Sequence, residues 1–126
     1  MTTLPATQFI QAHGVRLAYA EWPGPAGAET IICLPHLIGH KGSFGPLAQC
    51  LAPVWRVLAL DLRGRGESDR PDDGYGLAYH ARDILALADA LDLPRFVLIG
   101  HSFGASTAVY LASIRPNRVR ALVLLV

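Results

Sequence analysis

The N-terminal part of the chain alternates between apolar and polar residues over two short stretches. The alternation runs through residues 7–22 and is interrupted at His13 and Gly14. A period of two is typical of a β-strand that buries one face, and a glycine-containing pair between two such runs is typical of a tight turn. The pattern therefore predicts an N-terminal β-hairpin that turns at these two residues.

From residue 29 onward, short apolar runs alternate with segments of helical periodicity. Four runs are typical of buried strands, namely 29–35, 55–62, 94–100 and 118–126. Three segments are predicted as helices, namely 46–52, 77–93 and 102–115, the second with apolar residues at positions 77, 84, 85, 88 and 91. Residues 36–45 are predicted to be irregular and residues 61–76 to form a polar loop. This order predicts an α/β fold: a hairpin followed by a mostly parallel sheet flanked by helices.

Composition and charge limit the classes of partner. The chain has 126 residues, of which 52% are hydrophobic, and its formal net charge is +1. This size suits a single domain, and a nearly neutral charge gives no electrostatic reason to expect nucleic acid or an anionic membrane as a partner. The sequence contains neither a signal-peptide pattern nor an apolar run of membrane-spanning length, so we expect a cytoplasmic protein. Cys33 and Cys50 lack metal or redox spacing, and Cys33 is expected to be a buried thiol.

One serine lies in a pattern that carries chemistry. Residues 98–106 read LIGHSFGAS, which places Ser102 between Gly100 and Gly104, after an apolar strand and before a helix. A serine on a sharp strand-to-helix turn presents its hydroxyl, and glycines two positions away remove steric collisions at that turn. The helix N-terminus adds outward N–H groups, among them that of Phe103, which suit a developing oxyanion.

With this motif the chain resembles the α/β-hydrolase superfamily, and the resemblance extends over nearly all 126 residues. Residues 61–71, DLRGRGESDRP, look like the family's loop between a core strand and the next helix. Tyr79, Asp83 and Leu91 fall in the helix before the elbow strand, and residues 117–126 are similar to the strand after the elbow helix. The resemblance implies that residues 1–126 are the N-terminal portion of a single hydrolase domain.

The resemblance also implies a second oxyanion donor, after the strand that ends at Leu34. The best match to the family's segment is Leu34-Pro35-His36-Leu37-Ile38-Gly39, which places the Leu37 N–H at the donor position. A shift of one residue would give this role to Ile38. His36 stands where the family usually has glycine.

None of the five histidines is an evident base for Ser102. We expect His101 to be structural, His36 and His40 to pack or be hydrated in the loop over the serine, and His13 and His80 to lie in a turn and a helix. In the family the acid and the histidine follow the nucleophile, so both are expected beyond Val126. The apolar strand 118–126 would then leave an unpaired edge, which favours self-association or pairing with a second chain.

The motif and the resemblance imply that the complete protein is a serine hydrolase that acts on a small acyl substrate, generically a carboxylic ester or lactone. This chain alone is expected to be inactive or incomplete. Thioester, amide, carbon–carbon and perhydrolysis chemistry use the same elbow, whereas a serine disfavours the aspartate-nucleophile relatives such as epoxide hydrolases. The alternative is a non-catalytic fragment or binding scaffold without the acid and histidine. We predict no cofactor and no metal, because the elbow glycines lack dinucleotide spacing and the 61–73 loop lacks EF-hand spacing.

Overall fold

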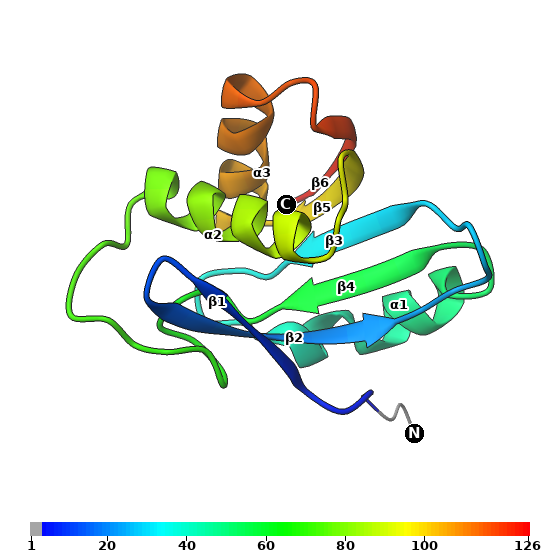
Figure 1. Cartoon of the computed structure of the whole chain (residues 1–126), viewed down its shortest axis with the longest axis horizontal. Helices are drawn as coiled ribbons and strands as arrows, with labels where there is room; N and C mark the ends of the chain where they lie inside the picture. Colours follow the sequence, from blue (N-terminus) through cyan, green and yellow to red (C-terminus); the bar gives the residue numbers. More distant parts are fainter. Residues whose placement is uncertain (1–3) are drawn as a thin grey trace.

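The computed structural model describes residues 4–126, which form one mixed sheet with helices on both faces (Figure 1). The six strands are β1 (Gln8–Ala12), β2 (Val15–Trp22), β3 (Thr30–Leu34), β4 (Arg56–Leu60), β5 (Phe96–His101) and β6 (Val119–Leu125). The helices are the 3-10 turn η1 (Lys41–Phe44), α1 (Gly45–Leu51), α2 (Leu77–Ala90) and α3 (Phe103–Ile114). The predicted α/β class is confirmed.

The strand pairing follows the predicted division of the chain. β1 and β2 form an antiparallel hairpin, and its turn residues His13 and Gly14 have φ angles of 51° and 81°. β2 also pairs antiparallel with β4, whereas β4, β3, β5 and β6 are mutually parallel along the sheet order β1-β2-β4-β3-β5-β6. β6 is therefore an edge strand of the described sheet.

Successive residues of the central strands enter two different cores, since side chains alternate across a sheet. On one face Ile32 and Leu34 pack with the apolar residues of α2 and α3. On the other face Ile31 and Cys33 pack with Phe44 and residues of α1. A strand buried on both faces reads as a continuous apolar run, which explains why these segments were recognisable in the sequence.

The connections after β3 lead to opposite sides of the sheet, and this switch indicates where a ligand site is expected. From β3 the chain moves to β4 on one side and then to β5 on the other side. In open α/β sheets, ligands bind beyond the carboxyl ends of the strands at such a switch point. β3 ends at Leu34 and β5 at His101, and Leu34 is paired with Gly100. The topology thus marks the segments that follow Leu34 and His101.

Two local predictions need correction. Residues 41–44, predicted as irregular, form the 3-10 turn η1, because the His40 side chain accepts a hydrogen bond from the Gly42 N–H and caps it. The buried face of α2 also differs from the apolar stripe. It comprises His80, Ala81, Asp83, Ile84, Leu87 and Ala88. Two polar residues occupy this face because each has a hydrogen-bonding partner, the buried Arg63 for Asp83 and the partly buried Arg65 for His80.

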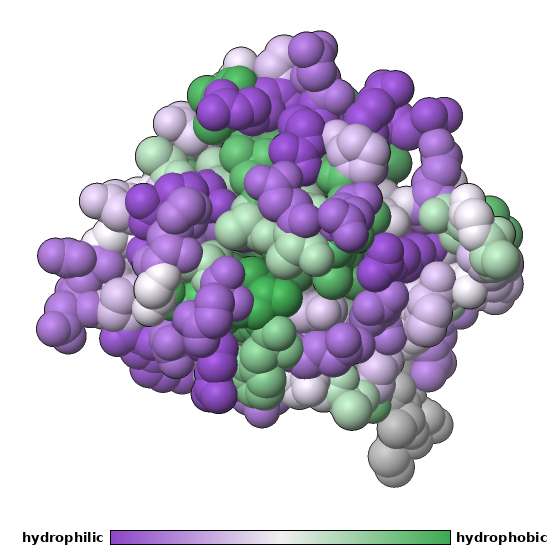
Figure 2. All heavy atoms as spheres, viewed as in Figure 1, coloured by the Kyte–Doolittle hydropathy of each residue, from purple (hydrophilic) through white to green (hydrophobic). Residues whose placement is uncertain are grey.

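Figure 2 shows polar and charged residues over most of the face that carries α2, with apolar residues gathered near its middle. Among the described helices none has the length and apolar character needed to cross a membrane.

Candidate active site

Ser102 lies at a sharp change of direction between β5 and α3. Its backbone has φ 54° and ψ −109°, a conformation far from that of the strand and the helix it joins. A non-glycine residue at such angles is strained by about 1–3 kcal/mol, and strain of this kind concentrates at functional sites. The Ser102 side chain is exposed, and its N–H donates a 3.0 Å hydrogen bond to the Leu125 carbonyl of β6.

The two flanking glycines are required by close backbone packing at this bend. A Cβ on Gly100 would lie 2.7 Å from the Ala105 Cα and would overlap the Gly104 carbonyl group. A Cβ on Gly104 would overlap the carbonyl oxygen of Leu34 at the end of β3. Gly100 and Gly104 therefore let α3 begin directly against β5 and β3, as the sequence motif predicted.

The first turn of α3 presents unused N–H groups. The N–H groups of Ala105 and Ser106 donate to the Ser102 carbonyl at 2.9 and 3.1 Å. The N–H groups of Phe103 and Gly104 form no hydrogen bond with any residue in 4–126. Free N–H groups at a helix N-terminus favour negative charge. The predicted donor Phe103 is thus the first helical residue, with its N–H unoccupied.

The predicted second donor lies in the turn that follows β3. The Gly39 N–H donates to the His36 carbonyl at 2.8 Å, so Leu37 and Ile38 are the central residues of a β-turn. The two residues are 53% and 85% exposed, and within residues 4–126 their N–H groups have no hydrogen-bond acceptor. Because Gly104 packs on Leu34, this turn begins beside the first turn of α3.

His36 and His101 connect this turn to the elbow. Their rings meet edge to face with centroids 5.1 Å apart. His36 follows β3 by two residues and His101 immediately precedes Ser102, so this contact joins the two segments that carry the candidate site. The structural role expected for His101 and the packing role expected for His36 agree with this contact.

The polar loop 61–76 is organised around the buried carboxylate of Asp61. Asp61 accepts hydrogen bonds from the Lys41 N–H (2.6 Å), the Lys41 Nζ (2.8 Å) and the Glu67 N–H (2.9 Å). Burial disfavours the charged form of Lys41, but its hydrogen bonds to Asp61 and Glu67 raise its pKa above the ordinary value. Asp61 therefore stabilises the loop, the role expected from its sequence setting.

A second buried pair attaches the same loop to α2. Nε and Nη2 of Arg63 donate to the two carboxylate oxygens of Asp83 at 2.6 and 2.9 Å, and both side chains are 2% exposed. Nη1 of Arg63 donates to the Gly74 carbonyl. The hydrogen bond to Asp83 raises the pKa of Arg63, so this cation stays charged throughout the accessible pH range.

The environment of Arg65 and His80 was not predicted from the sequence. His80 is fully buried, and its ring packs edge to face on Phe103 with centroids 5.0 Å apart. Arg65 contacts the same histidine and also reaches the turn at Leu37. A histidine on the buried face of α2 was the available signal, but only the tertiary contact identifies its partner.

Among the described residues, no side chain forms a hydrogen bond with the Ser102 hydroxyl, and no group of three or more His, Cys, Asp or Glu side chains is arranged to hold a metal ion. His40 is used as the cap of η1. Cys33 is buried, and burial raises the pKa of its thiol to about 12, whereas Cys50 is exposed; both are free thiols.

The chain is similar in sequence and in structure to several known proteins. The chain is 46% identical over 114 residues to a non-heme chloroperoxidase from Streptomyces lividans, covering 90% of this chain and 41% of that protein. It is 35% identical over 125 residues to an N-formylmaleamate deformylase from Pseudomonas putida, covering 98% and 46%. The crystal structure of Cfl2 from Burkholderia cenocepacia superposes with a TM-score of 0.90 at 30% identity, covering 98% of this chain and 45% of that one.

The chain thus spans less than half the length of each of these proteins. The sequence model of the alpha/beta hydrolase fold family matches residues 29–126, which include β3, the turn at Leu37, the loop 61–76 and the elbow. From its sheet order, its strained elbow and this match, the chain belongs to the α/β-hydrolase family.

Proposed function

We propose that Ser102 is the nucleophile of an acyl hydrolase, and the single observation that carries the proposal is its strained, exposed position beside unoccupied N–H groups. In this reaction the Ser102 Oγ attacks a carbonyl carbon and its proton passes to a general base. The carbonyl oxygen becomes an oxyanion that accepts hydrogen bonds from the N–H groups of Phe103 and Leu37. When the tetrahedral intermediate collapses, the base gives the proton to the leaving oxygen, so an ester substrate releases its alcohol and an acyl-enzyme remains. Water then hydrolyses the acyl-enzyme.

The proposal assigns the general base to a residue outside 4–126. No described histidine or carboxylate bonds the Ser102 hydroxyl, and an unassisted serine is a weak nucleophile. Removal of triad members lowers kcat by several orders of magnitude, so the 126-residue chain alone is expected to be nearly inactive. The shares of the relatives that the chain covers, 41% and 46%, are in keeping with this assignment.

The substrate class proposed is a small carboxylic acyl compound, with an ester or lactone as the generic form. Relatives are named for deformylation and for carbamate hydrolysis, both of which act at a carbonyl carbon. A p-nitrophenyl acyl ester is therefore a suitable first substrate, because it reports attack at a carbonyl without further recognition.

The test is labelling with a fluorophosphonate, followed by the intact mass. It is applied to the 126-residue chain and to the complete coding sequence that contains it. We expect one adduct on the longer protein, loss of this adduct in Ser102→Ala, and an unchanged adduct in Ser113→Ala, whose exposed hydroxyl binds a carbonyl at the far end of α3. A longer protein without any adduct, or an adduct that persists in Ser102→Ala, would contradict the proposal and favour a non-catalytic scaffold.

A further inference from the structure

The guanidinium of Arg65 joins the two segments that carry the proposed oxyanion donors. Its Nε donates to the Leu37 carbonyl at 3.0 Å, and its carbon lies 5.4 Å from the centre of the Phe103 ring. Its Nη1 lies 2.8 Å from the Arg63 carbonyl and 2.9 Å from the His80 Nε2. One side chain thus contacts the turn after β3, the loop 61–76, α2 and the first residue of α3.

The hydrogen-bond partners of His80 determine which of its ring nitrogens carries the proton. An arginine can only donate, so the His80 Nε2 must accept and the ring proton must lie on Nδ1. The Nδ1 is 3.0 Å from the Gly76 carbonyl, which accepts that proton. The ring is therefore neutral and in a single tautomer, and it offers a fixed acceptor to Arg65 while it meets the Phe103 ring edge to face.

The hydrogen bond to Leu37 fixes the orientation of one peptide plane. No peptide bond in the described chain is cis, and the C=O and N–H groups of a trans peptide point in opposite directions. Binding of the Leu37 carbonyl by Arg65 therefore turns the Ile38 N–H away from the guanidinium and restricts the rotation of the turn. The Leu37 N–H belongs to the preceding peptide of this turn and is restrained with it.

We propose that Arg65 and His80 are positioning residues, which hold the turn at Leu37 and the helix start at Phe103 in the relative placement that an oxyanion requires. This inference rests on the proposed function of Ser102, and it deepens that function by naming residues that act through Leu37 and Phe103. Neither Arg65 nor His80 touches the reacting atoms in this scheme. A pair of donors misplaced by a fraction of an ångström loses much of its effect on a developing charge.

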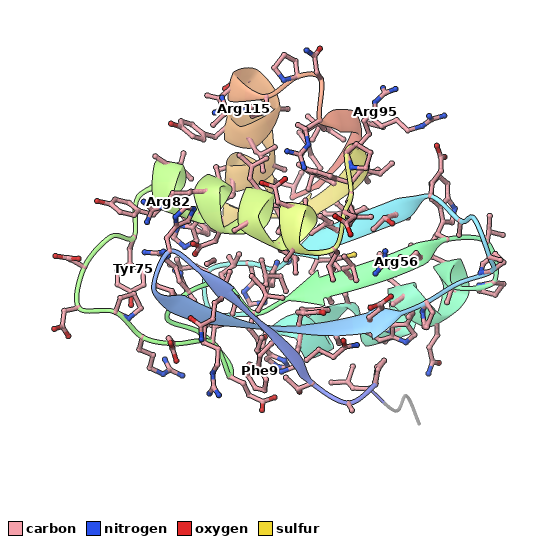
Figure 3. The ribbon with its side chains drawn as sticks, in the orientation of Figure 1. Phe9, Arg56, Tyr75, Arg82, Arg95 and Arg115 are labelled. Atoms are coloured by element: carbon pink, nitrogen blue, oxygen red, sulfur yellow. The ribbon has the colours of Figure 1, made fainter. Side chains whose placement is uncertain are left out.

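Several charged and titratable groups surround His80. Arg65 and Arg63 come from the loop, and Tyr75, labelled in Figure 3, comes from the end of the same loop, with its ring 6.4 Å from that of His80. Asp83 lies one turn further along α2 and is fully paired with Arg63. Both Asp83 oxygens accept hydrogen bonds from Arg63, so this carboxylate does not bond a protonated His80 beside Arg65.

The test combines a spectroscopic readout with a rate. Arg65→Met removes the donors but keeps the aliphatic stem, and Arg65→Lys restores one charged donor. Arg70→Met is the matched control, because Arg70 bonds the carbonyls of Gly64 and Gly66 in the same loop without reaching Leu37 or His80. Each variant is examined by ¹H–¹⁵N NMR of the 126-residue chain and by fluorophosphonate labelling of the complete protein.

We expect Arg65→Met to shift the Leu37 and Phe103 amide signals and to lower the labelling rate at least tenfold, with partial recovery in Arg65→Lys. Arg70→Met should leave both unchanged. Unmoved amide signals, or a labelling rate equal to that of the wild type, would overturn the positioning role. If the amide signals move as expected but the wild-type protein itself is never labelled, the positioning of Leu37 stands and the proposed function of Ser102 fails.

Discussion

Gly104 in α3 packs on the carbonyl of Leu34 at the end of β3, so closely that a single added carbon would overlap it. This contact brings the helix start and the turn after β3 together, although seventy residues separate them in the sequence. The catalytic geometry proposed for Ser102 depends on this approach, because both proposed N–H donors lie in the segments that meet here.

Gly104→Ala tests this packing directly. The new methyl group must displace backbone atoms, so we expect a loss of about 1–3 kcal/mol in the free energy of unfolding, measured with urea. Fluorophosphonate labelling of the complete protein should also decline. Gly76→Ala serves as the control, since Gly76 has φ −71° and open space around its Cβ position. Equal stabilities of the two variants would show that the contact is not a steric requirement.

Because Arg63 and Asp83 form a buried ion pair, a substitution at Asp83 should strongly lower the free energy of unfolding. Asp83→Asn removes one charge and leaves the guanidinium of Arg63 buried without its partner, which should destabilise the fold by about 3–5 kcal/mol. Asp89→Asn, at a pair whose carboxylate is 66% exposed, should cost no more than about 1 kcal/mol. Urea unfolding of both variants measures the difference, and a small effect at Asp83 would be contrary to the buried geometry.

His80 should make the stability depend on pH. Burial is the main cause that lowers the pKa of His80 from its ordinary 6.5, and the neighbouring Arg65 acts in the same direction. The unfolded chain therefore binds this proton at pH values where the folded chain does not. The contribution of His80 to the free energy of unfolding is complete above about pH 6.5 and declines as the pH falls toward the lower pKa of the folded state.

The slope from this one group cannot exceed about 1.4 kcal/mol per pH unit. Unfolding in urea between pH 5 and 8 should show a stability that rises with pH up to about pH 6.5 in the wild type, and a smaller rise in His80→Phe. His13→Asn, a change at an exposed position of the hairpin turn, should retain the wild-type rise. An identical pH dependence in wild type and His80→Phe would exclude His80 as its source.

The two cysteines should differ in reactivity toward a thiol reagent such as dithionitrobenzoate. Cys50 is exposed on α1, whereas Cys33 lies within the sheet and burial raises the pKa of its thiol to about 12. The native chain should release one equivalent of the chromophore rapidly, and the urea-unfolded chain two. Rapid release of two equivalents from the native chain would mean that β3 opens readily.

The edge strand β6 predicts association of the 126-residue chain. Its residues Leu122 to Leu125 are 37–46% exposed, and an unpaired edge offers backbone groups to another strand. Sedimentation should therefore depend on protein concentration, and Leu124→Lys should weaken that dependence by placing a charge at the edge. Val109→Lys on α3, a residue that is also 46% exposed, is the matched control. A wild-type chain that remains monomeric at high concentration would contradict this expectation.

The sequence predicted the elements that depend on local patterns. The hairpin at His13 and Gly14, the buried strands and the elbow at Ser102 were all recognisable, because each leaves a period or a spacing in the chain. It did not predict η1, whose cap is a histidine side chain at His40, a residue type outside the usual capping set.

The buried face of α2 was only partly predictable for a related reason. Hydrophobic periodicity finds Ile84 and Ala88, but it cannot assign His80 and Asp83 to the interior, because the burial of these polar residues depends on partners in the loop that precedes α2. The same limit applies to Arg65. Its contacts with the turn after β3, with α2 and with α3 become visible only when these segments are brought together in space.

The hydrogen bond from the Ser102 N–H to the Leu125 carbonyl couples the proposed nucleophile to an edge strand of the described sheet. Anything that tilts or displaces this strand pulls on the backbone amide of the serine itself. In the proposed role of Ser102 as nucleophile, the position of its hydroxyl therefore depends on the order of this edge strand. A neighbouring strand that paired with β6 would steady the proposed nucleophile as well.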